Sequence, residues 1–297
     1  MRNTVRPPFP YYGGKQTLAE RLVALLPPHR HYVEPYAGSL AVLLGKPRSR
    51  FETANDLDDD LRNFWEVLRT RDDELEVACG LTPHSRAEHT AAMDAEQPTE
   101  DPLERARRTW VLLTQGQSGA TGRRTGWRFF SKTAGGSSPM PRYLEGYVER
   151  FGPCVARLHG VSLECRPALE VVGTYGRHED VLLYIDPPYV LSTRKGRGYK
   201  HEMTDDDHRA LAAAVRRSAA TVVLSGYPSD LYDLELFPDW HRVELPAGTG
   251  NGGEWRERTE VVWSNRRLER PNDLFELALS ATRPYPDADK AGGARWA

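Results

Sequence analysis

The clearest apolar pattern in this chain is a run without polar alternation, Val181 to Ile185, followed directly by Asp186, Pro187, Pro188 and Tyr189. Such a run is typical of a strand buried on both faces of a parallel sheet. The prolines end the strand because neither can donate a ladder hydrogen bond, and the residue before a proline favours an extended conformation. We therefore expect a carboxylate, an outward carbonyl and an exposed aromatic ring at the carboxyl end of a central strand, where open α/β sheets bind ligands.

The first 70 residues follow an alternating strand and helix pattern. Short apolar strands are predicted at residues 31–34 and 51–54, with a glycine turn and a helix from Leu40 between them. A second helix is predicted from Asp58 through Leu68, since its apolar residues recur at helical spacing. A strand, a glycine turn, a helix, a second strand and an acid make the first half of a nucleotide-binding βαβ unit.

Three segments of this region carry candidate binding groups: Glu34-Pro35-Tyr36-Ala37-Gly38, Asp56, and Tyr11-Tyr12-Gly13-Gly14-Lys15. A glycine turn lets backbone amides approach a ligand, and an acid about 20 residues later is where nucleoside binders hold ribose hydroxyls. Paired glycines beside a lysine suggest close approach to an anion or a carboxylate. An ordinary βα turn and a surface lysine are the alternatives. The neighbouring Asp58, Asp59 and Asp60 are interpreted as helix-start acids on a solvated face.

Between residues 70 and 150 the pattern becomes mainly helical. Residues 72–118 are predicted to be helical with interruptions at prolines, and residues 141–158 are predicted to form one helix. Residues 115–140 are rich in Gly, Ser, Thr and Arg, and they interleave three large aromatic residues, Trp127, Phe129 and Phe130. Because a linker would lack such aromatics, we expect a hairpin or an ordered loop here.

The last third returns to alternating strands and helices. A polar, basic stretch at 191–200 follows the central strand, and Thr204 is predicted to cap a helix that begins with three aspartates and runs to about Ser218. A short helix is expected at 231–236. Further strands are predicted at 221–225, 241–245 and 260–264.

Composition adds limits to this α/β prediction. The formal net charge of −2 argues against nucleic acid at first, but the distribution is uneven. Residues 103–132 carry seven arginines and lysines against Glu104 alone, which is compatible with a DNA-facing surface and equally with a solvated face. Three scattered cysteines fit no zinc spacing and suggest a reducing cytoplasm. No apolar run approaches membrane-spanning length, and the N-terminus lacks the apolar core of a secretory signal.

Four motifs taken in order carry a family resemblance. YYGGK (11–15), YVEPYAGSLAVLL (32–44), ETANDLD (52–58) and LLYIDPPY (182–189) resemble the Dam-like class of adenine-specific DNA methyltransferases, with a weaker echo at 258–265. The resemblance implies a Rossmann-like methyltransferase sheet with an inserted, mainly helical target-recognition domain containing a hairpin. It places the catalytic domain at 1–70 and 146–270, the recognition domain at 71–145 and a C-terminal tail at 271–297.

The resemblance also implies a cofactor and its site. Members of this class take a methyl group from S-adenosylmethionine, and the positions that match their cofactor site are Tyr11 or Tyr12, Lys15, Glu34, Pro35, Gly38, Asp56 and Asp186. Two departures stand out. The class often has Trp-Ala before Gly-Gly-Lys and a longer glycine turn, whereas this chain has two tyrosines and a single Gly38.

The implied chemistry is methylation of the exocyclic amine of adenine. That amine is a poor nucleophile because its lone pair is conjugated with the ring, and Asp186 with the Pro187 carbonyl is expected to accept its two hydrogens. Pro188 completes the turn, and Tyr189 is expected to stack on the flipped base. Neither a metal nor a covalent intermediate is needed.

The resemblance implies double-stranded DNA as the partner, bound by a monomer or by a transient dimer. Candidate base and phosphate contacts are Gln115, Gln117, Arg123, Arg124, Arg128, Lys132, Arg194, Lys195 and Arg197, for each of which a surface role is the alternative. Two other functions stay open from the residues. One is an inactive DNA-binding module of this fold, and the other is amine methylation of cytosine or another substrate. The recognition sequence and any restriction partner do not follow from the motifs.

Overall fold

A seven-stranded sheet forms the centre of the computed structural model, which describes residues 5–94, 99–120, 124–129, 139–194, 196–251 and 254–268. The strand order is β3-β2-β1-β4-β5-β7-β6, and in this sheet β7 runs opposite to the other strands, antiparallel to both β5 and β6. The strands are β1 (His31–Glu34), β2 (Phe51–Asn55), β3 (Val161–Glu164), β4 (Val181–Ile185), β5 (Thr221–Gly226), β6 (His241–Asn251) and β7 (Glu254–Ser264). The predicted α/β class is therefore confirmed.

The order of the strands reverses between β1 and β4. The chain moves outward from β1 through β2 to β3 and then returns to β4 on the other side of β1. A crevice forms outside the carboxyl ends of strands at such a switch point, because the connections leave in opposite directions. The chain thus sets Glu34, at the end of β1, beside Asp186, which directly follows β4.

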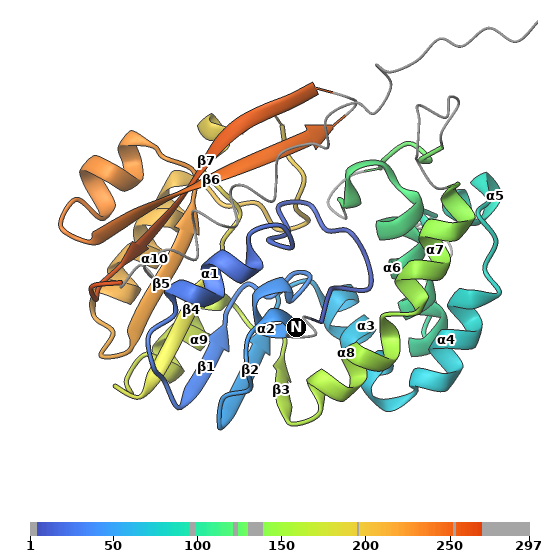
Figure 1. Cartoon of the computed structure of the whole chain (residues 1–297), viewed down its shortest axis with the longest axis horizontal. Helices are drawn as coiled ribbons and strands as arrows, with labels where there is room; N and C mark the ends of the chain where they lie inside the picture. The colour runs from blue at the N-terminus through green and yellow to red at the C-terminus, as the bar shows by residue number, and fades with distance from the viewer. Residues whose placement is uncertain are drawn as a thin grey trace, which may run out of the picture.

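Helices cover both faces of the sheet (Figure 1). One face packs against α1 (Ala19–Leu25), α2 (Ala41–Gly45), α3 (Asp59–Thr70) and α8 (Phe151–Leu158). The other packs against α9 (Ala168–Tyr175), α10 (Asp205–Arg216) and the π-helical turn η3 (Leu231–Leu236). Along β4 every residue is buried, as expected for a strand with both faces covered. No helix in the described ranges is long and apolar enough to span a bilayer.

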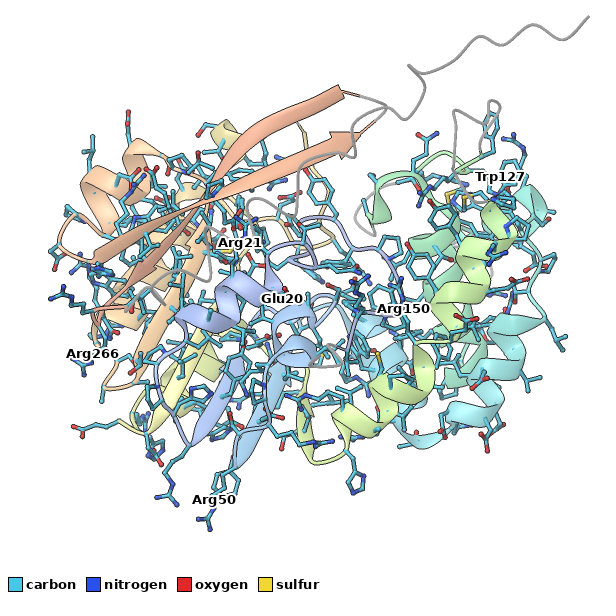
Figure 2. The ribbon with its side chains drawn as sticks, in the orientation of Figure 1. Glu20, Arg21, Arg50, Trp127, Arg150 and Arg266 are labelled. Carbon is cyan, nitrogen blue, oxygen red and sulfur yellow. The ribbon has the colours of Figure 1, made fainter. Side chains whose placement is uncertain are left out.

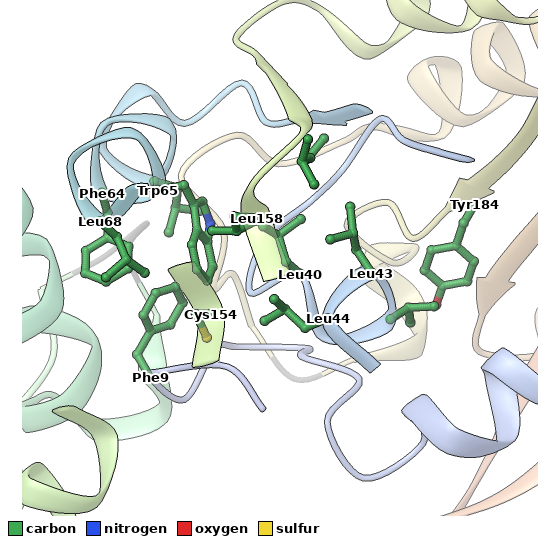
Figure 3. Packing of buried hydrophobic residues seen from close by; sticks show 14 of the residues in the cluster. Phe9, Leu40, Leu43, Leu44, Phe64, Trp65, Leu68, Cys154, Leu158 and Tyr184 are labelled. Carbon is green, nitrogen blue, oxygen red and sulfur yellow. The ribbon is translucent and has the colours of Figure 1, made fainter. Parts of the chain in front are cut away.

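A helical unit lies beyond the β3 edge of the sheet (Figure 1). It consists of α4 (Asp72–Gly80), α5 (Arg86–Ala92), α6 (Pro102–Gln115), the 3-10 turn η1 (Gln117–Gly119) and α7 (Met140–Val148). Its core is continuous with that of the sheet. Phe9 packs edge-on against Phe64 and close to Trp65, as Figure 3 shows, while Trp110 of α6 meets Phe151 of α8. The division at residues 71 and 145 stays a prediction.

Three local predictions have clear outcomes. Thr204 caps α10 as expected, with a reciprocal capping box to Asp207. The single helix predicted at 141–158 is wrong, because α7 ends before Glu149 and α8 begins at Phe151. Pro153 explains the break: within a continuous helix its ring would clash with the Glu149 carbonyl, whereas it is tolerated in the first turn of α8.

The region predicted as a hairpin pairs at its base. Gln117 donates its amide to the Gly126 carbonyl at 2.9 Å, and Arg128 donates to the Gln115 carbonyl at 2.7 Å. Gly116 and Trp127 form an antiparallel bridge between these bonds. The pairing of residues 115–117 with 126–128 therefore agrees with the predicted hairpin, while residues 121–123 and 130–138 lie outside the described residues.

Candidate active site

A cavity of about 260 Å³ opens at the switch point between β1 and β4. All three predicted binding segments line it, together with Asp186 at the end of β4. Two further segments, 167–169 before and within α9 and 199–203 after the central strand, complete its wall. The parallel sheet thus gathers residues that lie as far apart in the sequence as Tyr11 and Asp207.

Asp186 is fixed through one of its two oxygens. Its Oδ1 accepts a 2.8 Å contact from the Lys15 ammonium and a 3.0 Å hydrogen bond from the Ser225 hydroxyl. Ser225 in turn lies 3.1 Å from the Tyr184 hydroxyl, so a buried chain of groups from β4 and β5 orients the carboxylate. Within the described residues no group bonds Oδ2, which is left for a donor in the cavity.

Lys15 lies buried between two carboxylates. Its ammonium also bonds the Gly13 carbonyl at 2.8 Å and stands 3.8 Å from Glu260 of β7. Burial disfavours the charged ammonium, but Asp186 and Glu260 outweigh that effect and raise the pKa of Lys15. The lysine is therefore a fixed cation beside Asp186, and the alternative of a surface lysine is wrong.

Tyr189 differs from its prediction. Its side chain is not an exposed ring, since only 7% of the residue is accessible. The hydroxyl donates a short hydrogen bond to Glu260, and the ring meets Tyr227 edge-on with centroids 4.7 Å apart. Lys15 lies over the same ring, 4.8 Å from its centroid. The apolar strand correctly predicted the position of Tyr189 in the fold. Its burial comes from Tyr227, just after β5, from Glu260 of β7 and from Lys15.

The two tyrosines before Gly-Gly-Lys have separate places. The Tyr11 ring lies against Gly38, whose φ of +48° and lack of a side chain admit it; an added Cβ would be 2.8 Å from the ring. Tyr12 packs instead on Gly198 and on the Tyr199 ring, with centroids 5.1 Å apart. Tyr11 thus packs against the glycine turn, and Tyr12 packs against the segment around Gly198 and Tyr199.

Asp56 holds the glycine turn from the end of β2. Its oxygens accept the Gly38 amide at 2.8 Å and the Asp58 amide at 2.9 Å. Burial raises the pKa of Asp56 to about 6, although the two amides favour its ionised form. These two backbone amides therefore fix the orientation of the Asp56 carboxylate in the wall of the cavity.

Glu34 supports the neighbouring helix. Its Oε1 accepts the Tyr32 hydroxyl at 2.6 Å and the Leu43 amide at 2.9 Å, which satisfies one free amide in the first turn of α2. Burial raises the pKa of Glu34 to about 8. At neutral pH this side chain is mainly a neutral acid that contacts the cavity.

Asp58 was missed by the sequence interpretation, which put it on a solvated face. It is 3% exposed and lines the cavity. Its Oδ1 accepts the Asp60 amide at 3.1 Å and the Lys200 ammonium at 3.0 Å, while the buried Oδ2 has no hydrogen-bond partner among the residues that the structure describes. The available signal was its place as N-cap of α3, which turns its side chain back over the strand ends.

The basic stretch at 191–200 covers the cavity. Arg194, expected to meet DNA, has a side chain only 4% exposed, pairs with Glu202 and bonds the Tyr189 carbonyl at 2.8 Å. The same Glu202 accepts the backbone amides of Gly198 and Tyr199. Arg194 therefore stabilises the conformation of this segment through Glu202 and the Tyr189 carbonyl. Of the other predicted DNA contacts here, Arg197 is exposed and Lys195 lies outside the described residues.

Gln115 corrects the predicted base-reading set. It is fully buried, its amide nitrogen donates to the Pro83 carbonyl at 2.9 Å, and its oxygen accepts the Ser85 amide at 3.0 Å. These bonds tie α6 to the start of α5, so the side chain presents no edge to a base. Gln117 and Arg124 are exposed, whereas Arg123 and Lys132 lie outside the described residues.

A stack of flat groups marks the outer end of the helical unit. Trp127, labelled in Figure 2, stacks on His84 at 4.4 Å and on Phe129 at 5.6 Å. The Arg86 guanidinium lies over Trp127 at 4.8 Å from the ring centre. Arg128, also in the predicted set, is partly buried and lies 5.8 Å from the Tyr143 ring centre.

The chain is similar to known proteins over most of its length. Residues 11–242 match the family described as D12 class N6 adenine-specific DNA methyltransferase. DNA adenine methylases from two strains of Vibrio cholerae serotype O1, Classical Ogawa 395 and El Tor Inaba N16961, are 26% identical over 221 residues, which is 70% of this chain and 74% of each relative.

A solved structure, described as the SAM Dependent Methyltransferase from Agrobacterium tumefaciens, aligns with a TM-score of 0.36 and 11% identity. The alignment covers 85% of this chain and 62% of that one, which is less than two thirds of its length. The family match, by contrast, takes in the glycine turn, Asp56 and the Asp-Pro-Pro-Tyr segment together. This chain belongs to the D12 class of N6 adenine-specific DNA methyltransferases.

Proposed function

We propose that this adenine-specific DNA methyltransferase uses S-adenosylmethionine and methylates a flipped-out adenine within a short site in double-stranded DNA. The observation that carries the proposal is Asp186, with Oδ1 tied to Lys15 and Ser225 and Oδ2 open toward the cavity. A fixed acceptor of this kind suits an amine whose hydrogens must be held while its lone pair reacts.

The cavity fits the proposed cofactor in charge and in shape. S-adenosylmethionine carries a sulfonium cation, an amine and ribose hydroxyls, and the wall offers Asp56 and the unpartnered oxygen of Asp58 as acceptors. Gly38 leaves space that a side chain would fill, with the Tyr11 ring beside it. When bound, the cofactor supplies an electrophilic methyl group. Glu34 and Pro35 at the end of β1, which also line the cavity, contribute the wall on the side of Asp186.

The chain's own residues then orient the acceptor amine. Asp186 Oδ2 takes one hydrogen of the amine, and the carbonyl of Pro187 takes the other, which favours a tetrahedral nitrogen. Lys15 stays charged throughout, because its pKa is raised by the two adjacent carboxylates. Its charge lies 2.8 Å from the Asp186 carboxylate, which accepts the hydrogen bond from the amine.

Two steps involve the DNA side of the molecule. Extrusion of the adenine costs a few kcal/mol, which base stacking and phosphate contacts offset. Stacking on Tyr189 requires its ring, now 7% exposed, to be uncovered as DNA binds. The helical unit supplies the duplex contacts in this proposal, through Gln117, Arg124, Arg128 and the stacked rings around Trp127.

The test is methyl transfer from radiolabelled S-adenosylmethionine to duplex DNA, followed by separation of the nucleosides. We expect the label on N6-methyl-2′-deoxyadenosine, with single-stranded DNA a poorer substrate. The Asp186→Ala variant should lose at least about 10³-fold in rate, because removing one preorganised group of an electrostatic site has effects of roughly that size.

Asp180→Ala is the matched control, since Asp180 is an exposed acid immediately before the other end of β4. It should leave the rate within about twofold, as expected for a surface substitution. Label on cytosine would contradict the adenine assignment of the site. Near-normal activity of Asp186→Ala would contradict the role given to its carboxylate, whatever the labelled base.

A further inference from the structure

Glu260 is a buried carboxylate at the edge of the site, within the weaker family echo at 258–265, for which the sequence predicted no role. It lies on β7 opposite Leu245 of β6, and its side chain shares a sheet face with the apolar Val262. Strand residues two apart point to the same face, so Glu260 occupies a position where an apolar residue is expected. It is only 3% exposed. A charged group placed there requires partners, because burying an ionised carboxylate alone is strongly unfavourable.

Its partners are the residues beside Asp186. The Tyr189 hydroxyl donates a short hydrogen bond to Glu260 Oε1, and the Lys15 ammonium lies 3.8 Å from the same oxygen. Lys15 also contacts Asp186 at 2.8 Å, so one cation is shared by two carboxylates. Glu260 comes from a strand 71 residues further along the chain than Tyr189. It therefore joins β7 to the turn after β4.

We propose that Glu260 is a positioning residue for methyl transfer, which holds the Tyr189 ring and shares the Lys15 charge so that Asp186 remains a strong acceptor. This inference rests on the proposed role of Asp186. Without the second carboxylate, Lys15 would turn fully to Asp186 and neutralise it more completely. The Tyr189 ring would also lose the hydrogen bond that fixes its orientation next to the amine.

The protonation state of Glu260 links this arrangement to pH. Burial raises the pKa of Glu260 to about 7, with Asp186 adding to the effect and Lys15 opposing it. The charged and titratable groups that face it are Lys15 from the N-terminal segment, Asp186 and Tyr189 from the turn after β4, and Tyr184 of β4. As pH falls through about 7, Glu260 becomes neutral and no longer shares Lys15, so transfer should slow.

A purely structural role predicts something different. If Glu260 only secured the β6–β7 hairpin, an isosteric amide would lower the melting temperature and leave the rate of folded enzyme unchanged at every pH. The Glu260→Gln variant separates these possibilities, since it keeps the side-chain volume and an oxygen that can accept the Tyr189 hydroxyl. What it removes is the charge shared with Lys15.

The experiment measures single-turnover transfer by the full chain, with saturating S-adenosylmethionine and duplex DNA, between pH 5.5 and 8.5. We expect Glu260→Gln to slow transfer about 10-fold to 100-fold at pH 8, to leave KM for the cofactor within about twofold, and to lose the acid limb that the unchanged protein shows at or below about pH 7. Glu244→Gln is the matched control, because Glu244 is an exposed acid on the adjacent strand, paired with Arg242. It should behave as the unchanged protein.

A second variant covers the case in which Glu260→Gln fails to fold. Tyr189→Phe removes only the hydroxyl that Glu260 accepts, and we expect a loss of about 5-fold to 10-fold in the single-turnover rate, because one fixing hydrogen bond is lost. An unchanged rate and acid limb in Glu260→Gln, or an unchanged rate in Tyr189→Phe if the first variant is unfolded, would overturn the inference. If the unchanged protein itself did not methylate adenine, the proposed function would fail instead.

Discussion

The cavity and the helical unit differ in how their candidate residues are held. Around the cavity, residues from distant segments of the chain meet, and Lys15, Asp56 and Asp186 each make at least one directed contact below 3 Å. In the helical unit, Gln115 is locked inside while Gln117 and Arg124 stand exposed. A reactive site needs fixed geometry, whereas a surface that reads DNA can gain its final contacts when the duplex arrives.

The architecture explains that difference. The carboxyl ends of parallel strands come together at one edge of the sheet, so residues that follow strands are brought together by the fold itself. The helical unit has no such rule, because its exposed side chains depend on how a few helices and one turn pack. Its stack of His84, Trp127 and Phe129 is built from two segments more than 40 residues apart.

On the cavity side of this comparison, the largest effect on cofactor affinity is expected from Asp56→Asn. The substitution places an amide donor against the Gly38 or Asp58 amide and removes a charged acceptor for ribose hydroxyls. Affinity for S-adenosylmethionine should fall about 10-fold to 100-fold, the range typical of a lost hydrogen bond to a charged group. Isothermal titration calorimetry measures it directly, while kcat at saturating cofactor should stay within about threefold.

The control for this prediction is Asp59→Asn, three residues along. Asp59 pairs with Arg62 and Arg105 and is 45% exposed, so its loss should leave cofactor affinity unchanged. Equal weakening by both variants would mean that the acidic surface as a whole, and not the directed Asp56 carboxylate, attracts the cofactor.

Much of the cavity could be predicted from the sequence. The central strand, the glycine turn and Asp56 are local patterns, and each sits at the end of a predicted strand. The roles of Ser225 and Glu260 could not be predicted in this way, although Glu260 lies in the family echo at 258–265, because they depend on pairing between strands that lie far apart in the chain. Gln115 was misjudged for the same reason, since its partners Pro83 and Ser85 are about 30 residues away.

The role of the helical unit in DNA binding can be tested at Trp127. Trp127→Ala removes the central ring of the stack and the surface on which the Arg86 guanidinium rests. If the stack supports DNA contacts, KM for duplex DNA should rise about 10-fold, in keeping with the roughly 1–3 kcal/mol associated with an aromatic stacking contact. Cofactor affinity and the rate at saturating DNA should not change by more than about twofold.

Trp240→Ala provides the comparison for this variant. Trp240 is also a partly buried indole packed on another aromatic ring, Phe237, but it lies beside η3 on the opposite side of the sheet. It should leave KM for DNA unaltered. A rise in KM for both variants would indicate a general loss of stability, and a change in cofactor affinity for Trp127→Ala would contradict the separation of the two regions.

The smallest effect concerns pH, where the two regions should respond with opposite sign. In the cavity, burial raises the pKa of Glu34 to about 8, so between about pH 4.5 and 8 the folded protein retains a proton that the unfolded chain has lost. Stability contributed by this group therefore decreases as pH rises through that window. In the helical unit, hydrogen bonds from Arg107 lower the pKa of Glu104 to about 2. Its contribution is present above about pH 4.5 and is lost as pH falls toward 2.

Thermal unfolding of the apo protein from pH 5 to 8 separates these contributions. Glu34→Gln keeps an acceptor for the Leu43 amide and the Tyr32 hydroxyl but cannot ionise, so it should raise Tm at pH 8 by a few degrees and leave it unchanged at pH 5. Glu104→Gln should lower Tm by about 1–3 °C at both values, because its partly exposed ion pairs are present throughout this range. If Glu34→Gln shifted Tm equally at pH 5 and pH 8, its carboxyl would be ionised in the folded protein as in the unfolded chain. That result would contradict the raised pKa of Glu34, and with it the opposite pH response of the two regions. The lowered pKa of Glu104 would be unaffected.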